Sequence, residues 1–184
     1  PGQQHPLNSA SAALFKLAAL TYRLDAQQHW EPSLTDIKAK IDEARSQGIE
    51  PRVIVVINPG NPTGACMTRA EVEDMIKLAH RESLAIFADE VYQDNVYNKD
   101  RPFVPFRRVL MELQNSQDAS EREIGSSVEL VSFHSTSKGM VGECGRRGGF
   151  FVLNNMDAEV EAQINKVVSM RLCPPTQGQF GVCR

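Results

Sequence analysis

The apolar residues of the chain fall into short continuous runs, separated by segments in which apolar side chains recur every three or four positions. Short continuous apolar runs are typical of strands that are covered on both faces in a parallel sheet. We predict three such strands, at Arg52–Ile57, Leu84–Ala88 and Val128–Phe133. This alternation favours an α/β protein with three layers (α/β/α), in which helices cover both faces of a mostly parallel sheet.

A helix is expected to connect the first two strands. Thr68-Arg69-Ala70-Glu71 has the residue types of a capping box, in which the threonine and glutamate side chains bond to the first turn. From there to Glu82, apolar residues at helical spacing predict one buried face, formed by Val72, Met75, Ile76 and Ala79. Strand, helix and strand together make one βαβ unit with a right-handed crossover.

The region before the first strand is expected to contain two helices. Residues 1–8 hold two prolines and a glycine, which predicts an extended loop. The Ala/Leu-rich segment Ala12–Leu20 predicts a short helix, and Leu20–Leu24 is a further candidate strand. Ser33 then caps a longer helix, which Gly48 ends.

After the second strand, Pro102–Leu113 predicts a loop that enters a short helix. Asn115–Ser127 is polar and lacks an apolar pattern, so we expect an exposed surface loop there. A fourth strand, Gly148–Leu153, follows the third so closely that the two should be antiparallel. Asp157 caps a last helix, and Pro174-Pro175 stops it.

The composition is that of an ordinary globular protein and narrows the function classes. The chain has 184 residues, of which 41% are hydrophobic and 23% charged. A net charge of -3 provides no basic field for nucleic acid or anionic lipid, and no apolar run is long enough to span a bilayer. Four scattered cysteines, without a CxxC pair, argue against a zinc site and a disulfide framework. We expect one soluble domain in a reducing compartment.

Polar residues follow each of the three predicted parallel strands. Asn61 lies in the loop Asn58–Gly64 after the first strand. Asp89 ends the second strand, with Tyr92 three residues later, and Lys138 follows the third. Taken one at a time, these are more simply turn, cap or surface residues. The carboxyl ends of parallel strands meet at one edge of a sheet, however, where open α/β sheets bind ligands, so their convergence predicts one site.

An aromatic aldehyde that carries a ring nitrogen, a phenolic oxygen and a phosphate would give each of these residues a role. Lys138, if its amine is held in a cleft that disfavours the charged form, can bond to the aldehyde. Asp89 would keep the ring nitrogen protonated, while Asn61 and Tyr92 would bind the phenolic oxygen. Released by an incoming amino acid, Lys138 could then move a proton from the substrate. That chemistry is a transamination.

Several blocks of sequence resemble the large domain of the fold-type-I, pyridoxal-phosphate-dependent aminotransferases of class I and II, and in particular their alanine aminotransferases. The blocks occur in the family's order and are Ile57–Gly64, Ala88–Tyr97, Ser137–Gly139 with Gly142–Gly145, and Arg171–Pro175. The resemblance implies pyridoxal 5'-phosphate as cofactor. It further implies transfer of an amino group from L-alanine to 2-oxoglutarate, which gives pyruvate and L-glutamate.

The resemblance also implies roles for individual residues. Positions that match the family's lysine and cofactor contacts one by one are Lys138, Asp89, Asn61, Tyr92 and Ser135. Ser137 and an arginine would complete the phosphate site; the Gly-x-Arg-Gly-Gly pattern selects Arg147, whereas many relatives use the position of Arg146. His5 stands where the family usually has a tyrosine that stacks on the cofactor ring, and an imidazole can stack there too.

Parts of the family pattern have no counterpart in these 184 residues. They are the N-terminal arm, the small domain with the arginine that clamps the substrate carboxylate, and the glycine-rich phosphate loop. By resemblance, residues 1–184 are therefore a partial large domain of a homodimeric enzyme, and the isolated chain should have little or no transaminase activity. We expect a cytoplasmic location, with the mitochondrial matrix as the alternative.

Two other functions stay open at this point. The same lysine and cofactor serve enzymes with other amino donors, as well as lyases and synthases, because the pocket selects the bond that breaks. Substrate profiling separates these from an alanine aminotransferase. The second alternative is a non-catalytic module that binds the cofactor or only keeps the fold. A DNA-binding regulator would need a helix-turn-helix or a basic segment, and neither is evident in the sequence.

Overall fold

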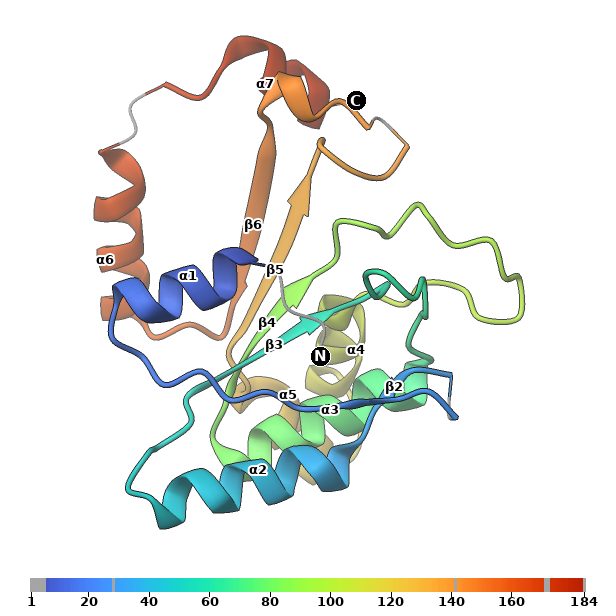
Figure 1. Cartoon of the computed structure of the whole chain (residues 1–184), viewed down its shortest axis with the longest axis vertical. Coiled ribbons are helices and arrows are strands. Elements are labelled where there is room, and N and C mark those ends of the chain that lie inside the picture. The colour runs from blue at the N-terminus through green and yellow to red at the C-terminus, as the bar shows by residue number, and fades with distance from the viewer. Residues whose placement is uncertain (1–5, 28, 141, 171–172, 184) are drawn as a thin grey trace.

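A four-stranded sheet lies at the centre of the computed structural model, which describes residues 6–27, 29–140, 142–170 and 173–183 (Figure 1). In spatial order its strands are β3 (Val53–Ile57), β4 (Ala85–Asp89), β5 (Leu130–Ser135) and β6 (Gly149–Asn154). The first three are parallel, and β6 runs antiparallel to β5. The predicted α/β class, the mostly parallel sheet and the antiparallel fourth strand are confirmed.

One face of the sheet carries the hydrophobic core. Alternate strand residues point to this face, and Ile54, Val56, Ile86, Ala88 and Leu130 are all buried there. Against them pack α3 (Arg69–Glu82), α4 (Phe106–Gln114) and α5 (Ala119–Ser127), with α2 (Leu34–Ser46) beside α3. Burying a large aliphatic or aromatic side chain contributes about 1.5–3 kcal/mol. This face therefore supplies most of the stability that holds the strand ends in place.

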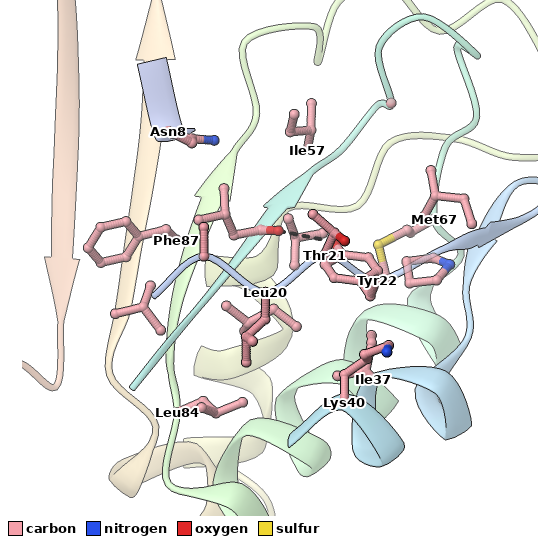
Figure 2. A pocket seen from close by; sticks show the side chains of 18 of the residues that line it. Asn8, Leu20, Thr21, Tyr22, Ile37, Lys40, Ile57, Met67, Leu84 and Phe87 are labelled. Carbon is pink, nitrogen blue, oxygen red and sulfur yellow. Dashed lines mark hydrogen bonds between the residues drawn. The ribbon is translucent and has the colours of Figure 1, made fainter. Parts of the chain in front are cut away.

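The other face is less completely covered, since Val55, Phe87 and Phe133 are only half-buried. Among the described residues, a full layer of helices therefore covers only the core face of the sheet, which is one of the two helical layers that we predicted. A mostly apolar cavity of about 380 Å³ is lined by α1 (Pro6–Leu14), the extended residues 17–22 and β3 (Figure 2). The Tyr22 hydroxyl donates to the carbonyl oxygen of Val55 over 3.0 Å, and loss of solvent raises the pKa of this phenol to about 12.

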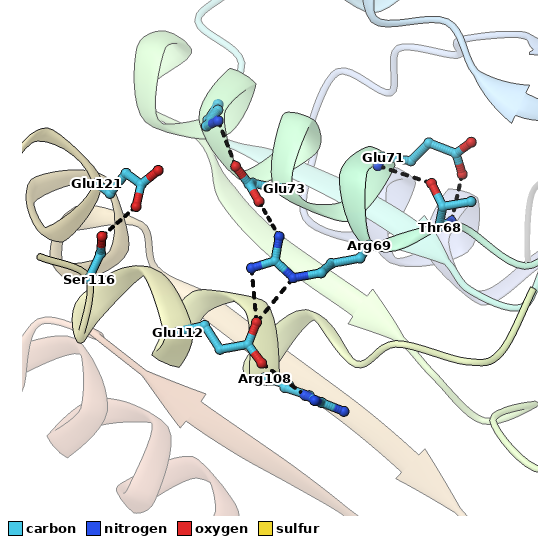
Figure 3. Close-up of polar contacts among 9 residues, drawn as sticks. Thr68, Arg69, Glu71, Glu73, Arg108, Glu112, Ser116 and Glu121 are labelled. Atoms are coloured by element: carbon cyan, nitrogen blue, oxygen red, sulfur yellow. Dashed lines mark hydrogen bonds and ion pairs between the residues drawn. The ribbon is translucent and has the colours of Figure 1, made fainter. Parts of the chain in front are cut away.

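The predicted capping box is confirmed and begins a polar network between helices (Figure 3). Thr68 Oγ1 accepts the Glu71 amide, and Glu71 Oε2 accepts the Thr68 amide over 2.7 Å. Arg69 then bridges Glu73 of its own helix and Glu112 of α4, at 2.6 Å and 3.0 Å. Because these groups are largely exposed, each pair contributes little, about 0–1 kcal/mol. They fix the register of α3 against α4.

The sequence prediction was wrong about Asn115–Ser127, which forms α5 and not a loop. Asp118 caps the helix by accepting the Ser120 amide over 2.7 Å, and Gly125 is buried against α4. The helix is polar because only a narrow stripe of it faces the core. Tertiary packing, together with a single cap, outweighs the low helix propensity of its serines and glycine.

The ends of the chain also differ from the prediction. α1 starts at Pro6, inside the predicted loop, because proline is tolerated in the first turn of a helix, and it ends at Leu14, short of Leu20. Of the candidate strand Leu20–Leu24, only Leu24 pairs, as part of β1 (Leu24–Asp25), which is antiparallel to β2 (Glu31–Pro32). α6 (Ala158–Ser169), the helix predicted after Asp157, contains no buried residue. A further helix, α7 (Thr176–Val182), follows the two prolines.

Gly125→Ala tests the contact between α4 and α5. An added Cβ would lie 2.5 Å from Gln114 N and 2.8 Å from Leu113 C, both backbone atoms of α4. Overpacking of this kind costs about 1–3 kcal/mol, more than the ~1 kcal/mol that alanine gains over glycine in a helix. We expect a lower free energy of unfolding in urea. Gly145→Ala is the control, since its Cβ meets no atom within 4 Å, and equal effects of the two substitutions would contradict the packing.

Candidate active site

The carboxyl ends of β3, β4 and β5 are tied together at one edge of the sheet. Ile57, Asp89 and Phe133 lie side by side in register on the three strands. The ladder continues beyond them, since the amide of Asn58 donates to Asp89 O over 3.0 Å and the amide of Glu90 donates to Phe133 O over 3.2 Å. The predicted site residues that follow these strands therefore start from a rigid common base.

Asn61 and Tyr92 meet as predicted, although they come from different loops. The Asn61 side-chain amide lies 3.3 Å from the Tyr92 hydroxyl. The loop that carries Asn61 is closed by a bond of 2.8 Å from the Gly60 amide to Ala65 O, and the buried Asn58 side chain accepts the Met67 amide over 2.9 Å. The Asn61 amide thus donates to the Tyr92 hydroxyl, and the two polar groups lie next to each other at this edge of the sheet.

Lys138 reaches the same place, because its ammonium nitrogen lies 5.9 Å from the centre of the Tyr92 ring. The lysine sits in a tight loop, in which the Gly142 amide donates to Lys138 O over 3.2 Å and Gly139 has a φ of +63°. Its side chain is exposed, however. The cleft around the amine, which the sequence analysis made a condition for its role, is not formed by the described elements.

Asp89 lies at the end of β4 on the half-buried face of the sheet, with its Oδ1 3.4 Å from the Val91 amide. The next residue, Glu90, alternates to the opposite face and is buried. The two neighbouring carboxyl groups therefore have different surroundings. Asp89 lies on the half-buried face of the sheet, and Glu90 is buried on the core side.

The predicted phosphate contacts are brought only partly together. Ser135 Oγ accepts the Ser137 amide over 3.1 Å and also bonds to Gly148 O over 3.2 Å. Arg147 folds back on its own loop and donates to Cys144 O over 2.9 Å and to Cys144 Sγ over 3.2 Å. Among the described residues, its guanidinium contacts neither serine. The geometry therefore leaves the choice between Arg146 and Arg147 open.

Cys144 was missed by the sequence analysis, which treated the cysteines only as candidate metal or disulfide residues. A hydrogen bond with Ser137 and the positive charges of Arg147 and Lys138 lower the pKa of the exposed Cys144 thiol. Cys144 therefore lies near Ser137, Lys138 and Arg147. The signal in the sequence was the position of Cys144 between the lysine and the two arginines.

A cavity of about 620 Å³ adjoins Asn61 and Tyr92 and is also lined by Trp30, Tyr97 and Arg101. His5, the predicted ring-stacking residue, lies outside the described residues. Within the described part of the chain, no group of three or more histidine, cysteine or acidic side chains could hold a metal ion. No helix in that part is both long and apolar enough to cross a membrane.

Comparison with known proteins decides the family. Residues 1–182 match the family described as aminotransferase class I and II. The chain belongs to this family. The predicted recognition is confirmed, and with it the expectation that the protein is related to enzymes.

Individual relatives agree with the family. Alanine aminotransferase 1 of Bos taurus is 45% identical over 179 residues, which are 97% of this chain and 34% of that protein. Glutamate–glyoxylate aminotransferase 1 of Arabidopsis thaliana is 40% identical, over 98% of this chain and 36% of that protein. A crystal structure of an aminotransferase from Escherichia coli is 28% identical with a TM-score of 0.76, over 98% and 40% of the two chains. The chain spans about a third of the length of the curated relatives it matches.

Proposed function

We propose that this chain provides the cofactor-binding side of the active site of an aminotransferase that uses pyridoxal 5'-phosphate. The amino group would pass between L-alanine and 2-oxoglutarate, forming pyruvate and L-glutamate. The observation that carries the proposal is the convergence of Asn61, Tyr92 and Lys138, from three separate loops, at one edge of a parallel sheet. Membership of the aminotransferase class I and II family supports it.

The side chains at this edge fit such a cofactor. The Asn61 amide and the Tyr92 hydroxyl are 3.3 Å apart, so both can donate to one phenolic oxygen. Asp89 offers a carboxylate to a protonated ring nitrogen. Asn61 and Lys138 are exposed, which leaves the approach open. When bound there, the cofactor supplies an electron sink for negative charge on the substrate α-carbon.

In this proposal, the chain's own residues hold and move protons. The Asp89 carboxylate keeps a proton on the ring nitrogen, and Asn61 with Tyr92 stabilises negative charge on the phenolic oxygen. Ser135, Ser137 and Arg147 bind the phosphate through hydroxyl and guanidinium hydrogen bonds. Lys138 Nζ holds the cofactor through a covalent bond and, when free, takes the proton from the substrate α-carbon. For that step Lys138 Nζ must have a free lone pair.

The choice of alanine rests on similarity and needs its own test. The Bos taurus alanine aminotransferase is somewhat more similar to this chain than the Arabidopsis thaliana glutamate–glyoxylate aminotransferase, at 45% and 40% identity. Use of glyoxylate as the amino acceptor is therefore the second candidate. The homodimer and the cytoplasmic location, with the mitochondrial matrix as the alternative, stay predictions.

Trapping of the cofactor on the purified chain tests the proposal. We expect pyridoxal phosphate to give a new absorbance band and, after borohydride reduction, one modified peptide that contains Lys138. Modification spread evenly over exposed lysines such as Lys99 and Lys166 would contradict a specific site. L-alanine, L-glutamate or glycine is then added to the chain that carries the cofactor. The spectral change after each addition shows which amino donor the site prefers. Because the isolated chain is expected to have little or no transaminase activity, a specific adduct that responds to none of these amino acids would agree with a partial large domain.

A further inference from the structure

The first turn of α4 lacks a cap of its own. Its N-cap residue is Pro105, which makes no side-chain hydrogen bond. The amide of Phe106, the first helical residue, instead donates to Glu90 Oε1 over 2.8 Å. Both residues are buried, with Glu90 only 6% exposed. Since a buried amide without a partner costs about 1–3 kcal/mol, Glu90 acts as the cap of a helix that begins 16 residues later in the chain.

Glu90 also lies between two residues of the candidate site, Asp89 and Tyr92. Its own amide donates to Phe133 O of β5 over 3.2 Å. The residue is therefore held at both ends, by its backbone to the strand that leads to Lys138 and by its side chain to α4. The turn after β4 is also held by its own bonds, since the Gln93 amide donates to Glu90 O over 3.1 Å and the Asn95 amide donates to Tyr92 O over 2.8 Å. Glu90 is the buried residue of this turn, and its side chain ties the turn to α4.

The charge of Glu90 is not fixed at neutral pH. Burial raises the pKa of its carboxyl from the usual 4.5 to about 7. The bond from the Phe106 amide and the hydroxyl of Ser132 on β5 oppose this rise, and the negative charge of Asp89 adds to it. Other charged or titratable side chains line the cavity of about 570 Å³ that Glu90 borders, namely Arg107, Arg108 and Glu112 of α4 and His134 of β5. Glutamine at position 90 would imitate the neutral form and keep an oxygen that can accept the Phe106 amide.

We propose that Glu90 is a positioning residue, which caps α4 from the end of β4 and thereby holds Asp89 and Tyr92 in the orientation that the cofactor site needs. The effect of Glu90 on cofactor binding rests on the proposed function, whereas its contact with α4 does not. It assigns a role to the one buried carboxyl at the site edge, among the described residues, that the proposed mechanism does not use.

Amide hydrogen exchange on the free chain tests the geometry, with Glu90→Ala and Glu90→Gln compared with the wild type. We expect Glu90→Ala to speed exchange at Phe106 and also at Val91 and Tyr92, and Glu90→Gln to restore slow exchange at all three. Unchanged exchange at Val91 and Tyr92 in Glu90→Ala would overturn the proposal. If Glu90→Ala does not fold, Glu90→Gln and the wild type still decide through their pH profiles.

The pH profile has a definite sign. Because the folded state binds the proton more tightly than the unfolded state, the stabilisation is fully present below pH 4.5 and is lost as the pH rises through 7. Between pH 5 and 8, the unfolding equilibrium constant of the wild type should rise about 10²-fold relative to that of Glu90→Gln. Parallel profiles would show that the carboxyl of Glu90 is not the buried, titrating cap described above, and the proposal would fail.

Cofactor trapping separates positioning from mere stability. At a pH where every variant is folded, we expect trapping of pyridoxal phosphate on Lys138 to be about 10- to 100-fold slower in Glu90→Ala, because small misplacements cost reactivity. Glu90→Gln should restore it. Equal trapping rates in the wild type and both variants would show that Glu90 only caps α4 and does not position the site, and would overturn the proposal. If the wild type shows no specific adduct, the proposed function fails instead, and hydrogen exchange alone decides the role of Glu90.

Discussion

Lys138→Ala is expected to abolish site-specific trapping of pyridoxal phosphate and to leave the fold intact. The substitution removes the amine that lies 5.9 Å from the centre of the Tyr92 ring, and no other described amine approaches that ring. Because the Lys138 side chain is exposed, its loss should change the free energy of unfolding by no more than about 0.5 kcal/mol. Borohydride reduction followed by peptide mapping measures the first effect, and urea unfolding measures the second.

Two controls separate a covalent role for Lys138 from a role of its charge. Lys166→Ala removes an exposed lysine of α6 and should leave the Lys138 adduct unchanged. Lys138→Arg keeps a positive charge near the Tyr92 ring but has no primary amine, so it should behave as Lys138→Ala does. Trapping that persists in Lys138→Arg at the same peptide, for example on another nucleophile of the loop, would disprove the covalent assignment.

The candidate site could be predicted because its residues share a topological position. Asn61, Asp89, Tyr92 and Lys138 each follow a strand, and parallel strands bring their carboxyl ends to one edge. The contact of 3.3 Å between Asn61 and Tyr92 agrees with that argument. Chain order alone does not reveal which segments cover a loop, and for this reason the exposure of Lys138 was not anticipated.

Glu90 shows a second limit of sequence reasoning. An acidic residue directly after Asp89 resembles a second surface carboxylate, and the period of two in a strand places it on the core face only if β4 continues to that point. Its partner is the first amide of α4, which becomes visible only when the helix starts at Phe106 with Pro105 as N-cap. The pairing joins residues whose spacing in the chain matches no local capping pattern.

The fold was predictable where local signals agree with each other. In α3, the capping box, the apolar spacing and the flanking strands all indicate the same helix, and its bounds match the prediction. α5 has one cap, at Asp118, and no apolar stripe, so nothing in its sequence separates it from a loop. Its helical state depends on the close approach of Gly125 to α4, a contact between segments that the sequence does not specify on its own.

Phe106→Ala is expected to have the largest effect on stability. Its ring is fully buried at the start of α4, in the core that packs the helices on the sheet. Removing a buried phenylalanine costs about 3–5 kcal/mol, a large part of the roughly 5–15 kcal/mol that stabilises a typical domain. The melting temperature should fall by about 10 °C. Met111→Ala on the same helix, where the side chain is 40% exposed, should cost much less.

Phe106→Ala also separates the packing of the Phe106 ring from the hydrogen bond that the amide of the same residue donates to Glu90. Phe106→Ala removes the ring but keeps the backbone amide that donates to Glu90, so the residue 106 amide should still exchange slowly under conditions where the chain is folded. Glu90→Ala does the reverse, because it removes the acceptor and leaves the ring in place. If Phe106→Ala lost both stability and amide protection, packing of the ring would be what brings Glu90 to the helix, and the cap would be a consequence of the core and not an independent tie.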